Sequence, residues 1–360
     1  MSALVAKLRK EIEQSGAISF ARFMEWALYS PGEGYYEQRN QIGRRGDFFT
    51  SVSVGSLFGE LLAFQFAEWL AEKNEFGKSK IIEAGAHDGK LASDILNWTN
   101  ANAPEVFENL EYWIIEPSEN RQSWQKETLH KFSNVKCAAQ LSDVPGAKDS
   151  KIDGIIFSNE LFDAMPVHRL GWDANKKKWF EWGVSWDGNN LVWKHLLENQ
   201  ESEIPFPELA PELMEILPDG FTTEVCPAAI RWWTEAASIL SSGKLIAIDY
   251  GLLAEDFFTP ARSGGTLRAF SRHHASSDLL TRPGEQDITA HVNFSALKEA
   301  GENAGLKTDA LITQPKILTE IAERSWKKFG EWDASRRKQF QTLTHPEHLG
   351  RAFRVLIQSR

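Results

Sequence analysis

The sequence predicts an α/β protein whose centre is a Rossmann-like, mostly parallel sheet. Three short apolar runs support this prediction, because each has the length of a buried strand: residues 81–84, 112–115 and 153–158. Polar or turn-forming sequence follows each run. Ligands of such open sheets bind beyond the carboxyl ends of the strands. The residues that follow each run are therefore the first candidates for a functional site.

The first run turns through two glycines into a helix, which the sequence predicts over Leu91–Leu96. Gly85 and Gly89 allow backbone N–H groups and the helix N-terminus to approach a nucleotide-like ligand. Glu83 precedes the first glycine, where a carboxylate would repel a pyrophosphate and so disfavours a dinucleotide. It suits a cationic or hydroxyl-rich ligand such as S-adenosylmethionine. A purely structural turn is the alternative interpretation.

The second run leads into Glu116-Pro117-Ser118. An acid that closes the second strand of such a unit can accept hydrogen bonds from ribose hydroxyls. The chain contains no phosphate-binding G-K-[ST] motif. Two strands that each end in a carboxylate favour an adenosine-type ligand without phosphates. The alternative is that Glu116 is a solvated loop acid.

The third run ends in Asn159, Glu160 and Asp163, followed by Pro166. The proline prevents an ordinary helix from continuing through this segment. Carboxylates three residues apart can face one way on a single turn and grip a guanidinium in bidentate fashion. The alternative is a helix N-cap, with acids placed near the positive end of the helix dipole.

In combination, these segments resemble the MidA-type family of class I methyltransferases, whose mitochondrial members are complex I assembly factors. The resemblance extends over nearly the whole chain, through the ordered motifs Gly46-Asp47-Phe48-Phe49-Thr50, Glu83–Gly89, Glu116-Pro117-Ser118, Asn159–Pro166, Asp249-Tyr250-Gly251, Gly265-Thr266-Leu267-Arg268 and Pro283–Val292. It implies a seven-stranded, mostly parallel sheet and S-adenosylmethionine as the cofactor. The family is similar to protein arginine methyltransferases, and its mitochondrial branch is associated with symmetric dimethylation of an arginine in a complex I subunit.

The order of the motifs and the resemblance together imply a set of site residues. Those expected to bind the cofactor are Gly46, Asp47, Thr50, Glu83, Gly85, Gly89, Leu91, Glu116, Ser118 and Asn159. Those expected to act on the acceptor are Glu160, Asp163 and His291. Carboxylates can polarise a guanidinium, whose lone pair is delocalised, and hold its charge away from the attacking nitrogen.

Three positions depart from the pattern that the family leads us to expect. Ala86-His87 stands in the first glycine turn, where Gly-Pro-Gly is expected. Phe270 stands where a tyrosine is frequent, and Asn293 stands where an aspartate is usual. The His87 side chain bears on the approach of the cofactor, and the other two changes remove a hydroxyl and a charge near the site.

The chain divides into three predicted regions. Residues 1–78 form a helical N-terminal region that includes a lid loop at 43–53. Residues 79–165 and 243–360 form the Rossmann-like core. Residues 166–242 form an inserted, substrate-side subdomain with an antiparallel meander. Its strands are predicted at 167–172, 178–186 and 190–197, and packing is the favoured role of its tryptophans. Residues 252–291 are predicted to be irregular, and such long segments are commonly functional.

Composition limits the partners and the compartment. The 360 residues carry a net charge of −10, which argues against the basic footprint of a nucleic-acid-binding protein and suits a basic peptide substrate. Two cysteines without a C-x-x-C motif fit a reducing compartment. The chain has no apolar run of membrane-spanning length and no apolar signal core, so we expect a bacterial cytoplasmic protein. A homodimer is compatible with the sequence but is not specified by it.

The histidines do not form a metal-binding pattern. His273 and His274 are adjacent, and neither they nor His291 have H-x-x-x-H spacing, so no metal is expected. The function that these observations favour is S-adenosylmethionine-dependent methylation of a protein arginine. Two alternatives remain: a methyltransferase for another side chain or a small molecule, and an assembly factor that binds the cofactor without turnover. A dehydrogenase is disfavoured because G-x-G-x-x-G is missing.

Overall fold

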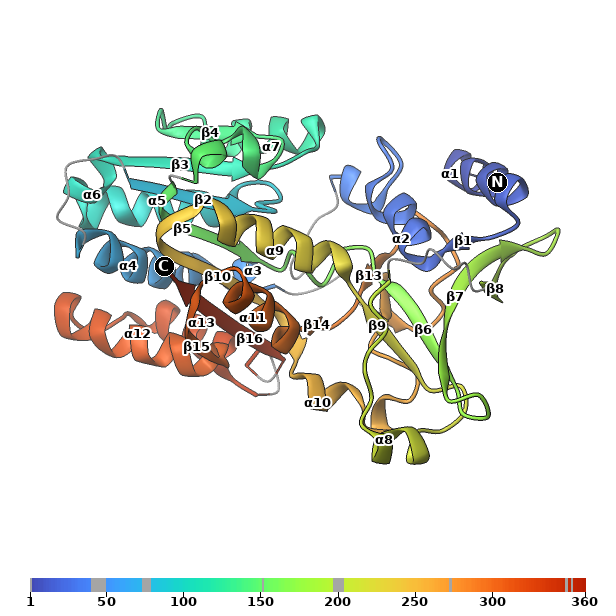
Figure 1. The fold of residues 1–360 in the computed structure, drawn as a ribbon. Helices are drawn as coiled ribbons and strands as arrows, with labels where there is room; N and C mark the ends of the chain where they lie inside the picture. The colour runs from blue at the N-terminus through green and yellow to red at the C-terminus, as the bar shows by residue number, and fades with distance from the viewer. Residues whose placement is uncertain are drawn as a thin grey trace.

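The computed structural model describes residues 2–39, 50–72, 79–150, 152–196, 204–271, 274–346, 349–350 and 352–360. In Figure 1 the Rossmann-like sheet and its helices form one half of the molecule, and a second sheet with the two N-terminal helices forms the other half. The helices are α1 (Ala3–Ser15), α2 (Phe20–Tyr29), α3 (Ser51–Val54), α4 (Leu57–Ala71), α5 (Lys90–Asn102), α6 (Pro104–Glu108), α7 (Glu119–Leu129), α8 (Pro211–Ile216), α9 (Pro227–Ile239), α10 (Ala254–Phe257), α11 (Phe294–Asn303), α12 (Gln314–Phe329) and α13 (Ala334–Thr344). Four 3-10 turns lie at Tyr35–Glu37, Leu141–Asp143, Ala147–Asp149 and Pro260–Arg262.

The main sheet has the strand order β15-β16-β10-β5-β2-β3-β4, with β14 paired to the end of β10. Its strands are β2 (Ser79–Ala84), β3 (Leu110–Ile115), β4 (Val135–Ala138), β5 (Ile152–Asn159), β10 (Leu240–Leu252), β14 (Val292–Asn293), β15 (Lys307–Thr313) and β16 (Phe353–Ser359). The strands from β4 to β10 are parallel, and β16 is antiparallel to both of its neighbours. The predicted seven-stranded, mostly parallel sheet is therefore confirmed, with β14 as an added short strand.

Helices cover both faces of this sheet, which explains why its central strands are apolar throughout. Ile155 packs with α4, α5 and α12 on one face, and its neighbour Ile156 packs with α9 and α11 on the other. The helix predicted at Leu91–Leu96 is α5, which extends further, to Asn102. Within the described ranges, no helix is both long and apolar enough to cross a membrane.

The second sheet has five strands: β1 (Ile18–Ser19), β6 (His168–Asp173), β7 (Lys178–Trp186), β8 (Leu191–His195) and β9 (Thr222–Val225). The predicted three-stranded meander is confirmed as β6, β7 and β8. The sequence did not indicate β1 and β9, which are two and four residues long. Because β1 pairs with β7, the N-terminal region and the inserted segment share this sheet. Their division into separate regions stays a prediction.

Tryptophans of the meander pack within the protein, as expected. Trp172 and Trp179 are buried in contact with each other, with their ring centroids 5.1 Å apart. Trp193 packs against Phe20 at the start of α2, again at 5.1 Å. The second contact joins the inserted segment to helix α2.

The segment 252–291 contains regular structure, so the prediction that it is irregular is wrong. It holds a three-stranded antiparallel sheet of β11 (Arg268–Ser271), β12 (His274–Ser276) and β13 (Asp287–Thr289), together with α10. Strands of three or four residues are too short to show the alternation of apolar and polar residues that marks a strand in a sequence. This small sheet brings β13 to the mouth of the main sheet, near β14 (Figure 1).

Two helices show what the sequence could and could not indicate. Ser19 caps α2, since its hydroxyl accepts a hydrogen bond from the N–H of Arg22 at 3.1 Å, and serine is a residue type preferred at this position. Helix α13 was not predicted, because its sequence is largely polar and only Leu343 is buried.

Candidate active site

One large cavity, of about 1570 Å³, lies at the carboxyl ends of β2, β3, β5 and β10. Of the predicted site residues, those that line it are Thr50, Glu83, Gly85, Leu91, Glu116, Asn159, Glu160, Asp163 and His291. Gly89 and Ser118 are not part of its lining, and Gly46 and Asp47 lie outside the described residues. Most of the candidate residues predicted from the sequence therefore lie together at one edge of the sheet. Their individual roles stay predictions.

The glycine turn combines two glycines in the left-handed region with one non-glycine residue. Gly85 has a φ of 75° and Gly89 a φ of 84°. A Cβ at Gly85 would meet Leu161 at 2.8 Å, so the missing side chain lets this turn approach the segment after β5. His87 adopts a φ of 47°, a conformation that is uncommon for residues other than glycine. The departure from Gly-Pro-Gly is thus accommodated in the backbone, and the His87 side chain lines the cavity.

Glu83 is buried at the end of β2 and faces the same cavity. Its carboxyl accepts a hydrogen bond from the Tyr112 hydroxyl at 2.6 Å. Burial raises the pKa of Glu83 to about 7, although this hydrogen bond opposes the shift. Glu83 can therefore exist as a neutral or a charged group near neutral pH, depending on what binds above it.

Glu116 is a buried, held carboxylate, and the interpretation as a solvated loop acid is wrong. One of its oxygens accepts hydrogen bonds from Arg121 Nη2 at 2.7 Å and from the N–H of Ser118 at 2.9 Å. The other oxygen has a long contact, 3.4 Å, with Gln125 Nε2. This second oxygen keeps capacity to accept a hydrogen bond from a ligand hydroxyl.

Ser118 has a different position from the one predicted. Its hydroxyl caps α7 by accepting from the N–H of Arg121, and it donates to Glu37 at 3.0 Å. The sequence E-P-S placed it directly after Glu116, but the chain turns into α7 at this point. In the structure Ser118 orders the support of Glu116 and does not line the cavity.

The segment after β5 is a turn, and the alternative of a helix that begins there is wrong. Glu160 adopts a left-handed φ of 52°, and its N–H donates to the carbonyl of Ile248 at 2.9 Å. Asn159 Nδ2 donates to the Glu160 carboxyl at 3.1 Å, while Asn159 Oδ1 is buried without a partner among the described residues. Glu160 and Asp163 both reach the cavity from this turn.

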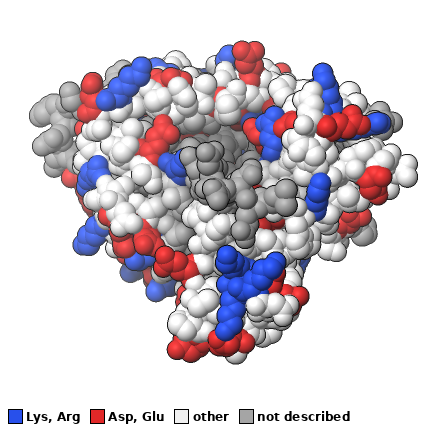
Figure 2. Space-filling view, turned by 45° about the vertical axis from the view of Figure 1, so that its right-hand side comes forward, with Lys and Arg blue, Asp and Glu red and all other residues white. Residues whose placement is uncertain are grey.

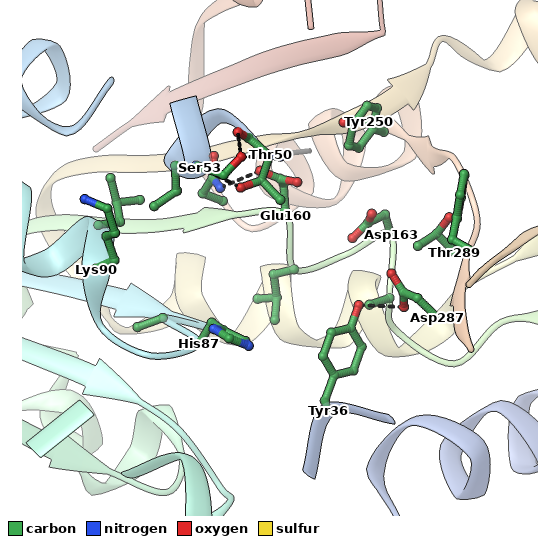
Figure 3. A pocket seen from close by; sticks show the side chains of 18 of the residues that line it. Tyr36, Thr50, Ser53, His87, Lys90, Glu160, Asp163, Tyr250, Asp287 and Thr289 are labelled. Carbon is green, nitrogen blue, oxygen red and sulfur yellow. Dashed lines mark hydrogen bonds between the residues drawn. The ribbon is translucent and has the colours of Figure 1, made fainter. Parts of the chain in front are cut away.

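Acidic groups gather at one end of the cavity. Figure 3 shows Glu160, Asp163 and Asp287 on one side, with His87 and Lys90 of the glycine turn on the other. Burial, followed by repulsion from Asp249, raises the pKa of Glu160 to about 8. The same two causes raise the pKa of Asp163 well above its ordinary value, and repulsion from Asp287 and Glu160 adds to the shift. This acidic end is therefore electrostatically suited to a cation.

Thr50 lies beside this acidic end. Its hydroxyl and that of Ser53 form a reciprocal capping box at the start of α3. Figure 3 shows both residues next to Glu160, and a hydrogen bond with the backbone of Ser51 counteracts the rise in the pKa of Glu160. The motif that ends at Thr50 was predicted to bind the cofactor, and the structure brings its last residue to Glu160.

His291 lines the cavity next to the small sheet. Its N–H donates to the Thr266 hydroxyl at 3.0 Å, and its ring Nδ1 is buried without a partner in the described part of the chain. Burial and the nearby Arg262 and Arg268 lower the pKa of His291 to about 4. The imidazole is thus neutral at pH 7 and can accept a hydrogen bond. His273 lies outside the described residues, and no metal-binding group of His, Cys, Asp and Glu occurs in those described.

Four further residues contribute to the acidic end. Tyr36 donates to Asp287 Oδ1 at 2.7 Å, and Tyr29 donates to the carbonyl of Ala164 at 2.8 Å (Figure 3 shows the first contact). Asp249 is fully buried beneath the turn. The motifs that contain Asp249 and Asp287 were noted in the sequence without a role, whereas nothing in the sequence pointed to the tyrosines.

The residues at the glycine-turn end fit S-adenosylmethionine. Glu116 retains an oxygen for ribose hydroxyls, and the buried Asn159 Oδ1 lacks a donor, which an ammonium group supplies. The backbone comes close at Gly85 because that residue has no side chain. Together, the sheet order and this donor set define a Rossmann-like, S-adenosylmethionine-dependent methyltransferase.

Comparison with known proteins identifies the family. Residues 61–312 match the family model described as "Putative S-adenosyl-L-methionine-dependent methyltransferase", and the chain belongs to this family. It is 28% identical to a mitochondrial protein arginine methyltransferase NDUFAF7 of Danio rerio, over 98% of this chain and 85% of the relative. The Homo sapiens protein of the same name is 27% identical, over 84% of this chain and 69% of that protein.

A solved structure supports the same assignment. The crystal structure of a likely methyl transferase from Burkholderia thailandensis, bound to S-adenosyl-homocysteine, matches this chain with a TM-score of 0.82 and 32% sequence identity. The match covers 99% of this chain and 92% of that chain. A native crystal structure from the same organism has a TM-score of 0.81 and 31% identity. The family resemblance, the fold class and the cofactor predicted from the sequence are confirmed.

Proposed function

We propose that this methyltransferase modifies an arginine side chain of a protein. The observation that carries the proposal is the group of carboxyls, Glu160, Asp163 and Asp287, at the end of the cavity away from the glycine turn. The names of the relatives from Danio rerio and Homo sapiens support an arginine acceptor. A cavity of about 1570 Å³ also exceeds the roughly 300–1,000 Å³ that a small ligand occupies, so it has room for a cofactor and an acceptor side chain.

The acidic turn provides what a guanidinium needs before it can react. Glu160 and Asp163 can each accept from its N–H groups, which fixes the plane of the group and draws its charge toward them. Because a bound cation stabilises carboxylates, arrival of the guanidinium lowers the pKa of both acids and releases their protons. When bound, S-adenosylmethionine supplies a methyl group activated by a positively charged sulfur. The carboxylates then orient a guanidinium nitrogen toward the glycine-turn end and take up the proton that the nitrogen loses.

Glu116 and the glycine turn have a separate task in this proposal. Glu116 is held by Arg121 and by the N–H of Ser118, so its second oxygen, which has only the long contact with Gln125, would accept from a ribose hydroxyl. Asn159 Oδ1 supplies an acceptor for an ammonium group. Holding both reactants in one cavity and excluding water accounts for a large part of the expected rate gain.

Transfer of labelled methyl groups to host proteins tests the proposal. Purified protein and labelled S-adenosylmethionine are incubated with lysate from cells that lack the protein, and labelled proteins are digested to amino acids. We expect labelled methylarginine, and its loss with Glu160→Gln. Label on another residue or on a small molecule would identify the other kind of methyltransferase, and binding without any transfer would identify an assembly factor.

We further propose a cytoplasmic protein that acts on an exposed arginine of a protein partner, without nucleic-acid or membrane partners. The net charge of −10 and the two cysteines support this assignment. On the face in Figure 2, acidic and basic side chains are mostly interspersed, and the compact group of basic side chains on the lower lobe has acidic ones at its edges. Fractionation of cells that express a tagged chain, followed by light scattering of the purified protein, tests the compartment and whether a homodimer forms.

A further inference from the structure

Asp249 is a buried carboxylate without a basic partner among the side chains that the structure describes. It lies in β10 between β5 and β16, and its exposed fraction is 0%. Arg354 is opposite it in β16, but that guanidinium contacts Asp256 and the carbonyl of Gly251. Within the described residues, no ion pair involves Asp249. A buried charge without a cation is costly, so other contacts must compensate it.

Backbone N–H groups provide this compensation. Asp249 Oδ2 accepts from the N–H groups of Leu161, Phe162 and Asp163, at 3.1, 2.8 and 3.4 Å. Its other oxygen accepts from the N–H of Tyr250 at 2.8 Å. Three successive N–H groups converge on one oxygen only if the chain curls around it, which is the geometry of a backbone anion nest. The turn after β5 is therefore wrapped around Asp249.

The same turn needs such support. Glu160 begins it in a left-handed conformation, which is unfavourable for a residue with a side chain. The turn is not helical, so its N–H groups have no carbonyl four residues earlier in a helix to bond, and they need another acceptor. A carboxylate oxygen has no hydrogen of its own and accepts several N–H groups at once. An asparagine would keep the shape but replace one oxygen with a donor.

We propose that Asp249 is a positioning residue, which holds the turn so that Glu160 and Asp163 face the acceptor end of the cavity. We call the set of hydrogen bonds from the N–H groups of residues 161–163 to Asp249 the clamp. The role of Glu160 and Asp163 rests on the proposed function, whereas the clamp rests on these hydrogen bonds alone. Among the described groups, Glu160, Asp163 and Tyr250 have pKa values that the charge of Asp249 raises, and Asp287 acts on Glu160 and Asp163 from the other side. Asp249 thus fixes the geometry of the acidic end. Burial raises its own pKa to about 7, against the backbone hydrogen bonds that lower it, so above this pH it also adds a negative charge beneath the turn.

Two variants separate geometry from charge. Asp249→Asn keeps the size and removes the charge, whereas Asp249→Glu keeps the charge and displaces the oxygens. Asp309→Asn, the same chemical change on β15 of the same sheet, is the matched control. Hydrogen exchange should become about tenfold faster or more at the amides of residues 161–163 in both variants of Asp249, and not in the control.

Kinetics provide the second measurement. In both Asp249 variants we expect kcat about tenfold lower or more, with KM for S-adenosylmethionine within about twofold of wild type. The charge of Asp249 raises the pKa of Glu160, so removing it lowers that pKa. The acid limb of the pH–rate profile should therefore move to lower pH in Asp249→Asn and stay in place in Asp249→Glu. A purely structural role would not move this limb.

The outcomes distinguish this inference from the proposed function. Wild-type exchange at residues 161–163 together with wild-type kcat in Asp249→Asn would overturn the clamp. If the wild-type protein transfers no methyl group to arginine, the proposed function fails, and exchange together with carbon-13 NMR titration of Glu160 still decides the clamp. If Asp249→Asn does not fold, the exchange and kinetics of Asp249→Glu decide it in the same way.

Discussion

The carboxyl groups at the two ends of the cavity differ in the partners that surround them. At the glycine-turn end, Glu116 is paired with Arg121, and Glu83 accepts from Tyr112. At the acidic end, no ion pair joins Glu160 or Asp163 to a basic side chain of the described residues, and their neighbours are further acids. At the first end, both carboxyls therefore have a hydrogen-bond partner, and Glu116 also has a basic one. The carboxyls of the second end lack a cation, and this difference supports the proposal that the cofactor binds at the first end and the acceptor at the second.

The largest effect should follow from changing an acid at the acceptor end. Glu160→Gln removes a carboxylate that stabilises charge in the transition state, and we expect methyl transfer to fall by roughly 3 kcal/mol, about a hundredfold. Affinity for S-adenosyl-homocysteine, measured by calorimetry, should not change. The exposed Glu320→Gln on α12 serves as a control. If Glu160→Gln abolishes cofactor binding instead, Glu160 belongs to the cofactor site, and the acidic end does not bind the acceptor.

A smaller effect should follow from changing the acid at the cofactor end. Glu116→Gln weakens hydrogen bonds to ribose hydroxyls, and we expect a loss of roughly 1–3 kcal/mol in affinity for S-adenosyl-homocysteine by calorimetry. Arg121 keeps its second partner, Glu37, so the variant should fold. A Glu116→Gln protein that binds the cofactor as wild type does, but fails to methylate, would contradict the comparison.

The raised pKa values of the buried acids should make the stability of the protein depend on pH. The pKa of Glu160 is about 8 in the folded protein and that of Glu83 is about 7, both above the ordinary value of 4.5. The folded state therefore holds more protons than the unfolded state, and stability falls as pH rises from about 5 to 8. Tm of the ligand-free protein should decrease across this window, and Glu160→Gln should flatten the decrease. A Tm that rises steadily with pH would show that the raised pKa values are wrong.

The smallest effect should follow from a change far from both ends. Residues 174–177 connect β6 and β7 at an exposed turn, which Asp173 caps by accepting from the N–H groups of Asn175 and Lys176. Replacing them with Asn-Gly gives a two-residue hairpin turn and should leave cofactor affinity unchanged. Calorimetry with S-adenosyl-homocysteine checks this. A large loss of affinity in a folded variant would show that the inserted segment contributes to the cofactor end.

The sequence predicted the features that depend on neighbouring residues. The apolar strands, the glycine turn, and the acids at Glu116 and Glu160 each follow from a short run of the chain. The support of those acids could not be predicted in the same way. Asp249 and Phe162 are 87 residues apart, and Tyr36 and Asp287 are 251 residues apart. Nothing local in the sequence indicates which distant N–H or hydroxyl group will meet a given carboxyl.

The short strands show a similar limit. β1, β9 and β13 have two to four residues each, fewer than an alternating pattern needs to be visible. They form only because neighbouring strands offer them backbone partners. The main sheet and the meander were therefore predictable, while β1, β9 and the small sheet of β11, β12 and β13 were not.

The hydrogen bond between Tyr36 and Asp287 has a consequence for the order in which the protein is made. The glycine turn and the support of Glu116 by Arg121 use residues that leave the ribosome within the first half of synthesis. The acceptor end needs Asp249 and then Asp287, which joins a tyrosine made 251 residues earlier. During translation, the wall of the acceptor end therefore cannot be completed until long after the elements of the cofactor end have been synthesised.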